Sequence, residues 1–236
     1  MIEAVRVTIT AYTASFRVPH FVGHQLTLPV PPLSTIYGLI SAAAGRWVLP
    51  QEVEWLAYRC EYESKAVDTE AILTVERPKP SDFARFVTRN VLPREFLVMP
   101  RLTLYLPPEW ESPFRCPRYP LLLGRTQDVA TVEGVKRVHL RQVSGGKVSG
   151  VLLPFELVAK GSVSAWLQNL PVAFTDEPLR QPIRTEIFGI VDAHRPGEVR
   201  DANGWLVMDE ENGVIVPIFR REGVLHGTTR ALGEIG

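Results

Sequence analysis

The sequence lacks any uninterrupted apolar run of the roughly 20 residues that a membrane-spanning helix needs, and it begins with a patterned strand rather than the apolar core of a secretory signal. We therefore expect a cytoplasmic protein with no membrane partner. Cysteine is scarce: Cys60 and Cys116 are far apart and form no C-x-x-C, so neither a disulfide framework nor a cysteine metal site is predicted. The motifs G-x-S-x-G, H-E-x-x-H and G-x-G-x-x-G are absent, so acyl transfer, zinc proteolysis and dinucleotide chemistry lack their usual signatures.

The charge is balanced in total but not along the chain. Lys and Arg number 26, as do Asp and Glu. Between residues 77 and 141, however, twelve basic residues face six acidic ones, a surplus of six, while acids gather at 52–76 and 176–222. A polyanion would meet the protein at 77–141. The alternative is that these Arg side chains form an ordinary solvated surface.

The first half predicts an α+β fold with a ferredoxin-like sheet. Val5, Val7 and Ile9 alternate with polar residues over 3–12, which indicates a half-buried strand. A Pro-rich loop follows over 16–32. Ser34 or Thr35 then caps a short amphipathic helix that ends at Gly45. Strands are expected near 53–62 and 71–77, and a Pro-rich and Arg-rich excursion resembling an extended hairpin covers about 78–96.

The second half is more strongly β. Residues 135–143 and 148–158 flank a Ser-Gly-Gly-Lys turn, and 204–208 and 214–219 flank a turn that ends in Asn-Gly, so two hairpins are predicted. We expect a domain over 1–142 with a β-rich extension, 143–236, packed on it.

Several local patterns could carry chemistry. Gly145-Gly146-Lys147 lacks the spacing of a phosphate loop and is better interpreted as a hairpin turn. The string Gly124-Arg125-Thr126 suits a phosphate better, because Gly allows close backbone approach and Arg can fork onto two oxygens. His20 and His24 have a metal-ligand spacing, but Pro19 and Gly23 disfavour a helix there, and no metal or other cofactor is expected. Metal-independent RNA cleavage would need a set such as His24, Tyr37, Lys136 and His139, and nothing in their spacing indicates that they converge.

Two blocks of the sequence are distinctive. The first is FRVP at 16–19 with TLPVPPLSTIYGLISAAAG at 27–45, and the second is YPLLLGRTQD at 119–128. Together they resemble the fifth CRISPR-associated protein family, one of the repeat-associated RAMP proteins of type I Cascade. LPFEL at 153–157 is a fainter echo of the type I-B-like branch of that family. The resemblance covers most of residues 1–141.

This resemblance implies an RNA-recognition-like fold with a thumb near 78–96, bound to the 5′ handle of the guide RNA (crRNA) beside the backbone and large subunits of Cascade. Target DNA would be met through the complex. One branch of the family is the guide-processing endoribonuclease, which uses a tyrosine and an adjacent Lys-His pair. No Lys-His dipeptide occurs here, which favours a non-catalytic role.

The residues expected to bind RNA are therefore His24, Ser34, Thr35, Tyr37, Arg77, Arg89, Arg94, Arg101, Gly124, Arg125 and Thr126. The Arg side chains would take phosphates, the helix start would add backbone N–H groups, and His24 or Tyr37 would lie near bases or sugars. Two alternatives stay open: an endoribonuclease that makes the guide, and a structural bridge between Cascade subunits whose RNA is held by neighbours.

Overall fold

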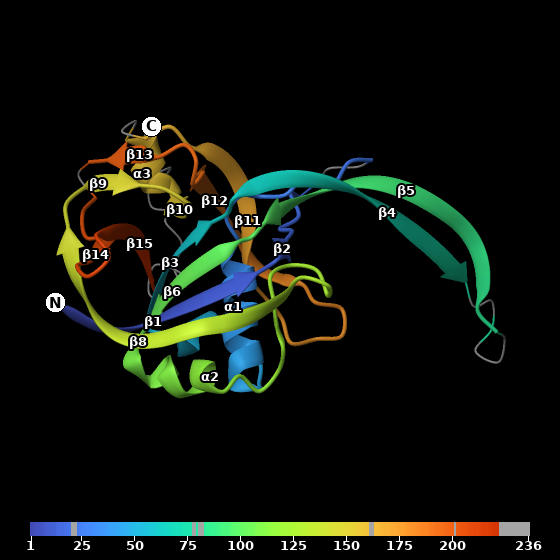
Figure 1. Cartoon of the computed structure of the whole chain (residues 1–236), viewed down its shortest axis with the longest axis horizontal. Coiled ribbons are helices and arrows are strands. Elements are labelled where there is room, and N and C mark those ends of the chain that lie inside the picture. Colours follow the sequence, from blue (N-terminus) through green and yellow to red (C-terminus); the bar gives the residue numbers. More distant parts are fainter. Residues whose placement is uncertain (20–22, 77–78, 80–82, 161–162, 201, 222–236) are drawn as a thin grey trace, which may run out of the picture.

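Six antiparallel strands form a closed ring in the computed structural model, which describes residues 1–19, 23–76, 79, 83–160, 163–200 and 202–221. In order around the ring they are β1 (Ile2–Ala11), β6 (Arg101–Leu106), β3 (Trp55–Glu61), β15 (Val214–Arg220), β14 (Leu206–Asp209) and β8 (Val129–Val143). The ring closes because the long strand β8 pairs with β14 at one end and with β1 along most of its length (Figure 1). The short β7 (Leu121–Leu122) adds to β8.

The alternation expected over 3–12 is confirmed in β1, where Val5, Val7 and Ile9 are fully buried. Each Val or Ile points into the main core cluster because neighbouring side chains of a strand point to opposite faces. The mixed α and β composition, dominated by strands, agrees with the expected class. The ring also contains β14 and β15, so it runs across residue 142, where the sequence suggested a division.

The predicted helix forms as α1 (Leu33–Ala44), but its start differs from the expectation. Pro32 is the N-cap and no side chain caps the first turn, so neither Ser34 nor Thr35 is the capping residue. Pro supports this start because its fixed φ suits the entry to a helix. The end is as expected: Gly45 adopts the left-handed conformation, at φ +75°. The helix packs against β11 (Trp166–Phe174).

A long two-stranded hairpin projects from the body, made of β4 (Ser64–Glu76) and β5 (Arg85–Val98) (Figure 1). β2 (Thr13–Ala14) pairs with it near its base, and Gln25 forms an isolated bridge to Arg94 on β5. The sequence placed an excursion at about 78–96, so the hairpin is longer than expected and starts earlier. The strand expected near 71–77 covers only the second half of β4. The first half was missed because a ribbon exposed on both faces has no buried face to impose an apolar period.

The two faces of this hairpin differ in polarity, since paired residues share a face. One face is mainly apolar and carries the pairs Val75 with Phe86, Leu73 with Arg89 and Ala71 with Val91. The other is mainly polar and carries Glu76 with Arg85, Thr74 with Thr88 and Ile72 with Asn90. On the apolar face, large side chains such as Val75 and Phe86 are more than half exposed.

The other described residues form two small sheets and four short helical segments. β10 (Val151–Pro154), β12 (Pro182–Val191) and β11 form one sheet, and β9 (Gly146–Val148) pairs with β13 (Gly197–Val199). The helical segments are α2 (Glu111–Arg115), α3 (Phe155–Ala159) and the 3-10 turns at Pro50–Glu52 and Pro108–Trp110.

One of the two hairpins predicted for the second half is confirmed, because β14 pairs directly with β15. The other is wrong. β8 continues around the ring, and the chain leaves it after Ser144, whose carbonyl accepts a hydrogen bond from the backbone N–H of Ala202. β9 then pairs with β13 rather than turning back on β8.

Candidate nucleic-acid interface

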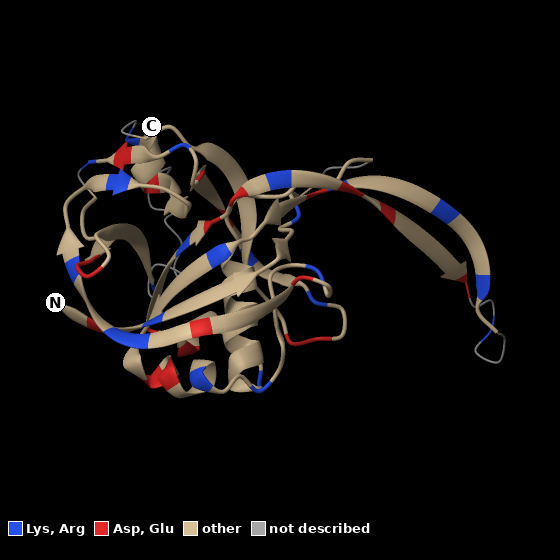
Figure 2. Ribbon diagram, in the orientation of Figure 1, with Lys and Arg blue, Asp and Glu red and all other residues tan. Residues whose placement is uncertain are grey.

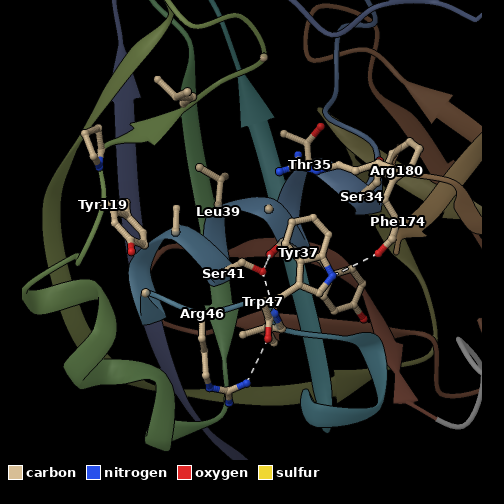
Figure 3. Close-up of a pocket in the computed structure, with 17 residues that line it drawn as sticks. Ser34, Thr35, Tyr37, Leu39, Ser41, Arg46, Trp47, Tyr119, Phe174 and Arg180 are labelled. Atoms are coloured by element: carbon tan, nitrogen blue, oxygen red, sulfur yellow. Dashed lines mark hydrogen bonds between the residues drawn. The ribbon is translucent and has the colours of Figure 1, made fainter. Parts of the chain in front are cut away.

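A cleft of about 750 Å³ opens between α1, the segment before Gly124 and the turn that joins β11 to β12 (Figure 3). Its size is typical of a ligand site. The chain reaches it from parts that are distant in sequence: Ser34, Thr35, Tyr37, Gly38, Leu39, Ser41, Ala42, Gly45, Arg46, Trp47, Val48, Tyr119, Pro120, Leu122, Gly124, Phe174 and Arg180. These described lining residues include two cations and no carboxylate. The electrostatics of the cleft therefore favour an anion.

The start of α1 supplies one wall of the cleft. Ser34 and Thr35 lie there, half-buried, and the first turn contains no acidic residue. The backbone N–H of Thr35 donates to the carbonyl of Pro32. Because the N-terminus of a helix carries partial positive charge, this wall attracts negative groups even though neither hydroxyl is a cap.

Tyr37 lies in the cleft with only 4% of its surface exposed. Burial raises the pKa of its phenol well above the ordinary value, so the phenol is neutral at physiological pH. The nearby Ser41 is occupied structurally: its hydroxyl donates to the Tyr37 carbonyl at 2.7 Å and accepts from the Val48 backbone N–H at 2.9 Å. Among the described residues, the hydroxyl of Tyr37 has no such pair of hydrogen bonds, unlike the hydroxyl of Ser41.

The turn at Gly124 approaches another backbone closely. Gly124 adopts φ +110°, and a Cβ there would lie 2.0 Å from the carbonyl oxygen of Ser15. Only glycine fits this approach. Arg125 forks onto the buried carboxylate of Asp128 with two hydrogen bonds of 2.9 Å, and these bonds raise the pKa of Arg125. The guanidinium is thus held inside the turn, whereas Thr126 is exposed.

The remaining predicted residues lie away from the cleft. Arg94 on β5 forms an ion pair with Glu70 on β4, and Gln25, next to His24, bridges to the Arg94 backbone. Arg89 lies exposed farther along β5. Arg101 pairs with Glu133 at 2.8 Å on another surface of the ring. Arg77 lies outside the described residues.

The structure therefore brings together four predicted residues, Ser34, Thr35, Tyr37 and Gly124, in one cleft. Arg125 lies beside the hairpin, 5.5 Å from the ring centre of Phe96 on β5. Gln25, the neighbour of His24, forms a backbone bridge to Arg94 on the same hairpin. Arg89 and Arg101 lie apart from this group and from the cleft.

The basic surplus at 77–141 is reduced by folding, because acids from the flanks pair with it. Figure 2 shows the mixture of charges over the body and the cations spaced along β5. Acids outside the block pair with Arg94, Lys136, Arg137 and Arg141. Arg101, Arg115 and Arg125 pair with acids of the block itself, which the surplus already counts. Within the described part of this block, Lys79, Arg85, Arg89 and Arg118 have no such partner. The window count therefore overstated the local positive charge.

Sequence reasoning missed the other end of the cleft, where Trp47 and Arg180 meet. The guanidinium carbon of Arg180 lies 4.7 Å from the Trp47 ring centre. The indole N–H of Trp47 donates to the carbonyl of Phe174 at 3.2 Å. No spacing or motif joins residues so far apart along the chain. Tyr119 was part of a quoted block, but nothing assigned it a role.

No known family model matches the chain, and no curated protein matches it in sequence. Solved structures do. A chain of a CRISPR RNA-guided surveillance complex is 19% identical with a TM-score of 0.51, and the match covers 85% of this chain and 92% of that chain. A chain of the type III-B Cmr-β complex bound to cognate target RNA is 9% identical with a TM-score of 0.55, covering 92% and 99%. A chain of the same complex bound to target RNA and AMPPnP is 8% identical with a TM-score of 0.55, covering 89% and 98%.

The protein therefore has the fold of protein chains found in CRISPR RNA-guided complexes. The expected likeness to CRISPR-associated proteins is confirmed at the level of the fold. In the described part of the chain, no helix is both long and apolar enough to cross a membrane. Nor do three or more His, Cys, Asp or Glu side chains gather as a metal site among those residues.

Proposed function

We propose that this chain is a non-catalytic, RNA-binding subunit of a type I Cascade complex, which holds the 5′ handle of the crRNA in the cleft beside α1. One observation carries the proposal. The two sequence blocks that resemble the family are far apart in the chain, yet Ser34, Thr35 and Tyr37 of the first and Gly124 of the second line the same cleft. The fold shared with chains of CRISPR complexes supports the same assignment.

The physical chemistry of the cleft suits single-stranded RNA. The helix start and two Arg side chains offer positive charge, and Trp47 and Tyr119 offer aromatic surface. Single-stranded nucleic acids are held by this combination, in which cations contact the backbone and rings stack on bases.

In this proposal the domain is a ferredoxin-like RAMP domain and the β4–β5 hairpin is its thumb. The hairpin and the small C-terminal sheets would contact the backbone and large subunits, and target DNA would be met through the assembled complex. The uncovered apolar face of the hairpin supports a protein contact there, because a lone two-stranded ribbon is marginally stable in water.

A charge reversal in the cleft tests RNA binding. Thr35→Asp places a carboxylate at the helix start, where it is compatible with the helix and repels phosphate. We expect affinity for a labelled 5′ handle RNA, measured by fluorescence anisotropy, to fall about tenfold or more. The matched control is Ser112→Asp, on the exposed surface of α2, which should leave affinity unchanged. Equal affinities for wild type and Thr35→Asp would reject the cleft as the RNA site.

The non-catalytic part of the proposal has its own test. Purified protein is incubated with repeat RNA in excess chelator, and the products are resolved on a denaturing gel. We expect intact RNA. Site-specific cleavage that Tyr37→Phe or His24→Ala abolishes would instead make the chain a metal-independent endoribonuclease.

A further inference from the structure

Arg180 has an unusual position in the cleft, because its charged group lies on an aromatic ring instead of an acid. Its guanidinium carbon is 4.7 Å from the ring centre of Trp47, within the range of a cation–π contact. The ring itself is fixed, since its N–H donates to the Phe174 carbonyl on β11. Trp47 therefore acts as a platform attached to the same strand that leads to Arg180.

Stacking leaves the hydrogen-bonding groups of Arg180 available. The five N–H donors of a guanidinium lie in its plane, so a contact through its flat face does not use them. In the described residues, no acid or carbonyl accepts a hydrogen bond from the Arg180 side chain, which is exposed. Arg46, the other cation of the cleft, pairs with Glu52. Arg125 forks onto Asp128. Among the described residues that line the cleft, Arg180 is therefore the cation whose N–H donors are free.

The surroundings of Arg180 favour an anion. Figure 3 shows Arg180, Trp47, Ser34 and Thr35 together on one side of the cleft, so the guanidinium and the positive end of α1 act on the same space. Asp176 and Glu177 lie in the same turn as Arg180, but neither lines the cleft. An ordered, unpaired guanidinium facing a helix start is well matched to a phosphate group.

We propose that Arg180 binds a backbone phosphodiester of the single-stranded RNA in this cleft, and that Trp47 is a positioning residue that orients its guanidinium. The inference rests on the proposed function, because it assigns the phosphate contact within the proposed RNA cleft. It also predicts that a large part of the affinity comes from the C-terminal half of the chain, outside both sequence blocks that resemble the family.

The first test compares Arg180→Ala and Arg180→Lys with Arg195→Ala, a control at an exposed arginine that does not line the cleft. Affinity for the handle RNA is measured by anisotropy at several salt concentrations. Arg180→Ala should weaken binding about tenfold and reduce the salt slope by about 0.7, the value for one contact to a single strand. Arg180→Lys should keep the slope but bind less tightly, since it retains the charge and loses the fork. Arg195→Ala should match wild type.

The outcomes separate the two claims. Wild type that binds no RNA would overturn the proposed function and this inference together. Wild type that binds, with Arg180→Ala equal to it in affinity and slope, would overturn the inference alone. Inorganic phosphate and a nucleoside monophosphate serve as competitors: displacement of the RNA by the nucleotide and not by an equal concentration of phosphate supports a nucleic-acid site. Equal competition by both would indicate a general anion site and would overturn the RNA assignment.

A double-mutant cycle tests the role of Trp47. Trp47→Leu should weaken binding, and Arg180→Ala should then add little, because the unsupported arginine is already poorly placed. Trp47→Phe keeps an aromatic face and should retain most of the affinity, which guards against a loss of folding in Trp47→Leu. Additive effects of Trp47→Leu and Arg180→Ala on affinity would overturn the positioning role.

Discussion

The closed ring and the projecting hairpin use similar residues under opposite conditions. In the ring, Leu104 on β6 is fully buried, whereas Leu73 on β4 of the hairpin is 60% exposed. Every ring strand has two neighbours, while the outer part of the hairpin has only its own two strands. The same residue type therefore stabilises the fold in one region and leaves apolar surface in water in the other. Folding of the single chain explains the buried apolar residues of the ring. It does not explain the exposed apolar residues of the hairpin.

The largest expected effect is in the ring. Leu104→Ala removes a side chain from the main core cluster and leaves a cavity among close-packed strands. The free energy of unfolding should fall by about 2–5 kcal/mol, measured by urea denaturation. A loss below about 1 kcal/mol would mean that the strands relax around the cavity. The closed ring would then be less rigid than its continuous strand pairing indicates.

The next effect concerns a buried carboxylate that joins three strands of the ring. Asp209 on β14 is completely buried and accepts hydrogen bonds from Arg6 on β1 at 2.7 Å and from the Tyr105 hydroxyl on β6 at 3.0 Å. Its other carboxylate oxygen accepts a hydrogen bond from the backbone N–H of Glu211 at 3.1 Å. Asp209→Asn should cost about 1–3 kcal/mol in urea denaturation, because an amide has one acceptor oxygen and cannot serve donors on both sides.

Glu211 provides the control for this prediction. It contacts the same Arg6 at 3.2 Å, but its side chain is 46% exposed. Glu211→Gln should change the free energy of unfolding far less than Asp209→Asn, because solvent screens exposed ion pairs. Equal losses in the two variants would show that burial does not distinguish the two acids.

Alkaline pH should affect the ring through Cys60 on β3. Burial raises the pKa of this thiol to about 12, whereas an unfolded chain has a Cys pKa of about 8.5. The folded state thus holds the proton more tightly, so this stabilisation is complete below about pH 8.5 and is lost as pH rises toward 12. Between pH 8 and pH 10 it should decline by up to about 2 kcal/mol.

Cys60→Ala removes this titration and isolates it. The difference in unfolding free energy between wild type and Cys60→Ala should shrink from pH 8 to pH 10, because the cavity cost of the variant does not depend on pH. A difference that is constant over this range would contradict the prediction. The hairpin strands contain no Cys or Tyr and should contribute nothing to this dependence.

The same contrast explains which features could be predicted from the sequence. β1 and α1 each bury one face, so the apolar period of each was visible and both were located within a few residues. The first strand of the hairpin buries neither face, and its start was missed. Ring closure depends on pairs such as β8 with β14, whose register no local pattern encodes.

The residues of the candidate site also divide into those that a local sequence pattern marks and those whose contacts form only on folding. Gly124 was found because its turn requires glycine. Ser34 and Thr35 were found because the apolar period locates the start of α1, although neither residue caps it. The positions of Arg94 and Arg125 could be predicted as basic, but their acid partners depend on folding. Trp47 and Arg180 had no signal at all, since their contact joins the end of α1 to the turn after β11.

The smallest expected effect on stability is in the hairpin, and it completes the comparison. Leu73→Ala is the same substitution as Leu104→Ala, but the side chain is already mostly in water, so the free energy of unfolding should change by no more than about 0.5 kcal/mol. Urea denaturation measures both variants side by side. A loss near that of Leu104→Ala would mean that the hairpin folds back onto the body in solution. If Leu73→Ala leaves stability unchanged and still impairs assembly into the proposed complex, then the apolar face of the hairpin acts in binding and not in folding.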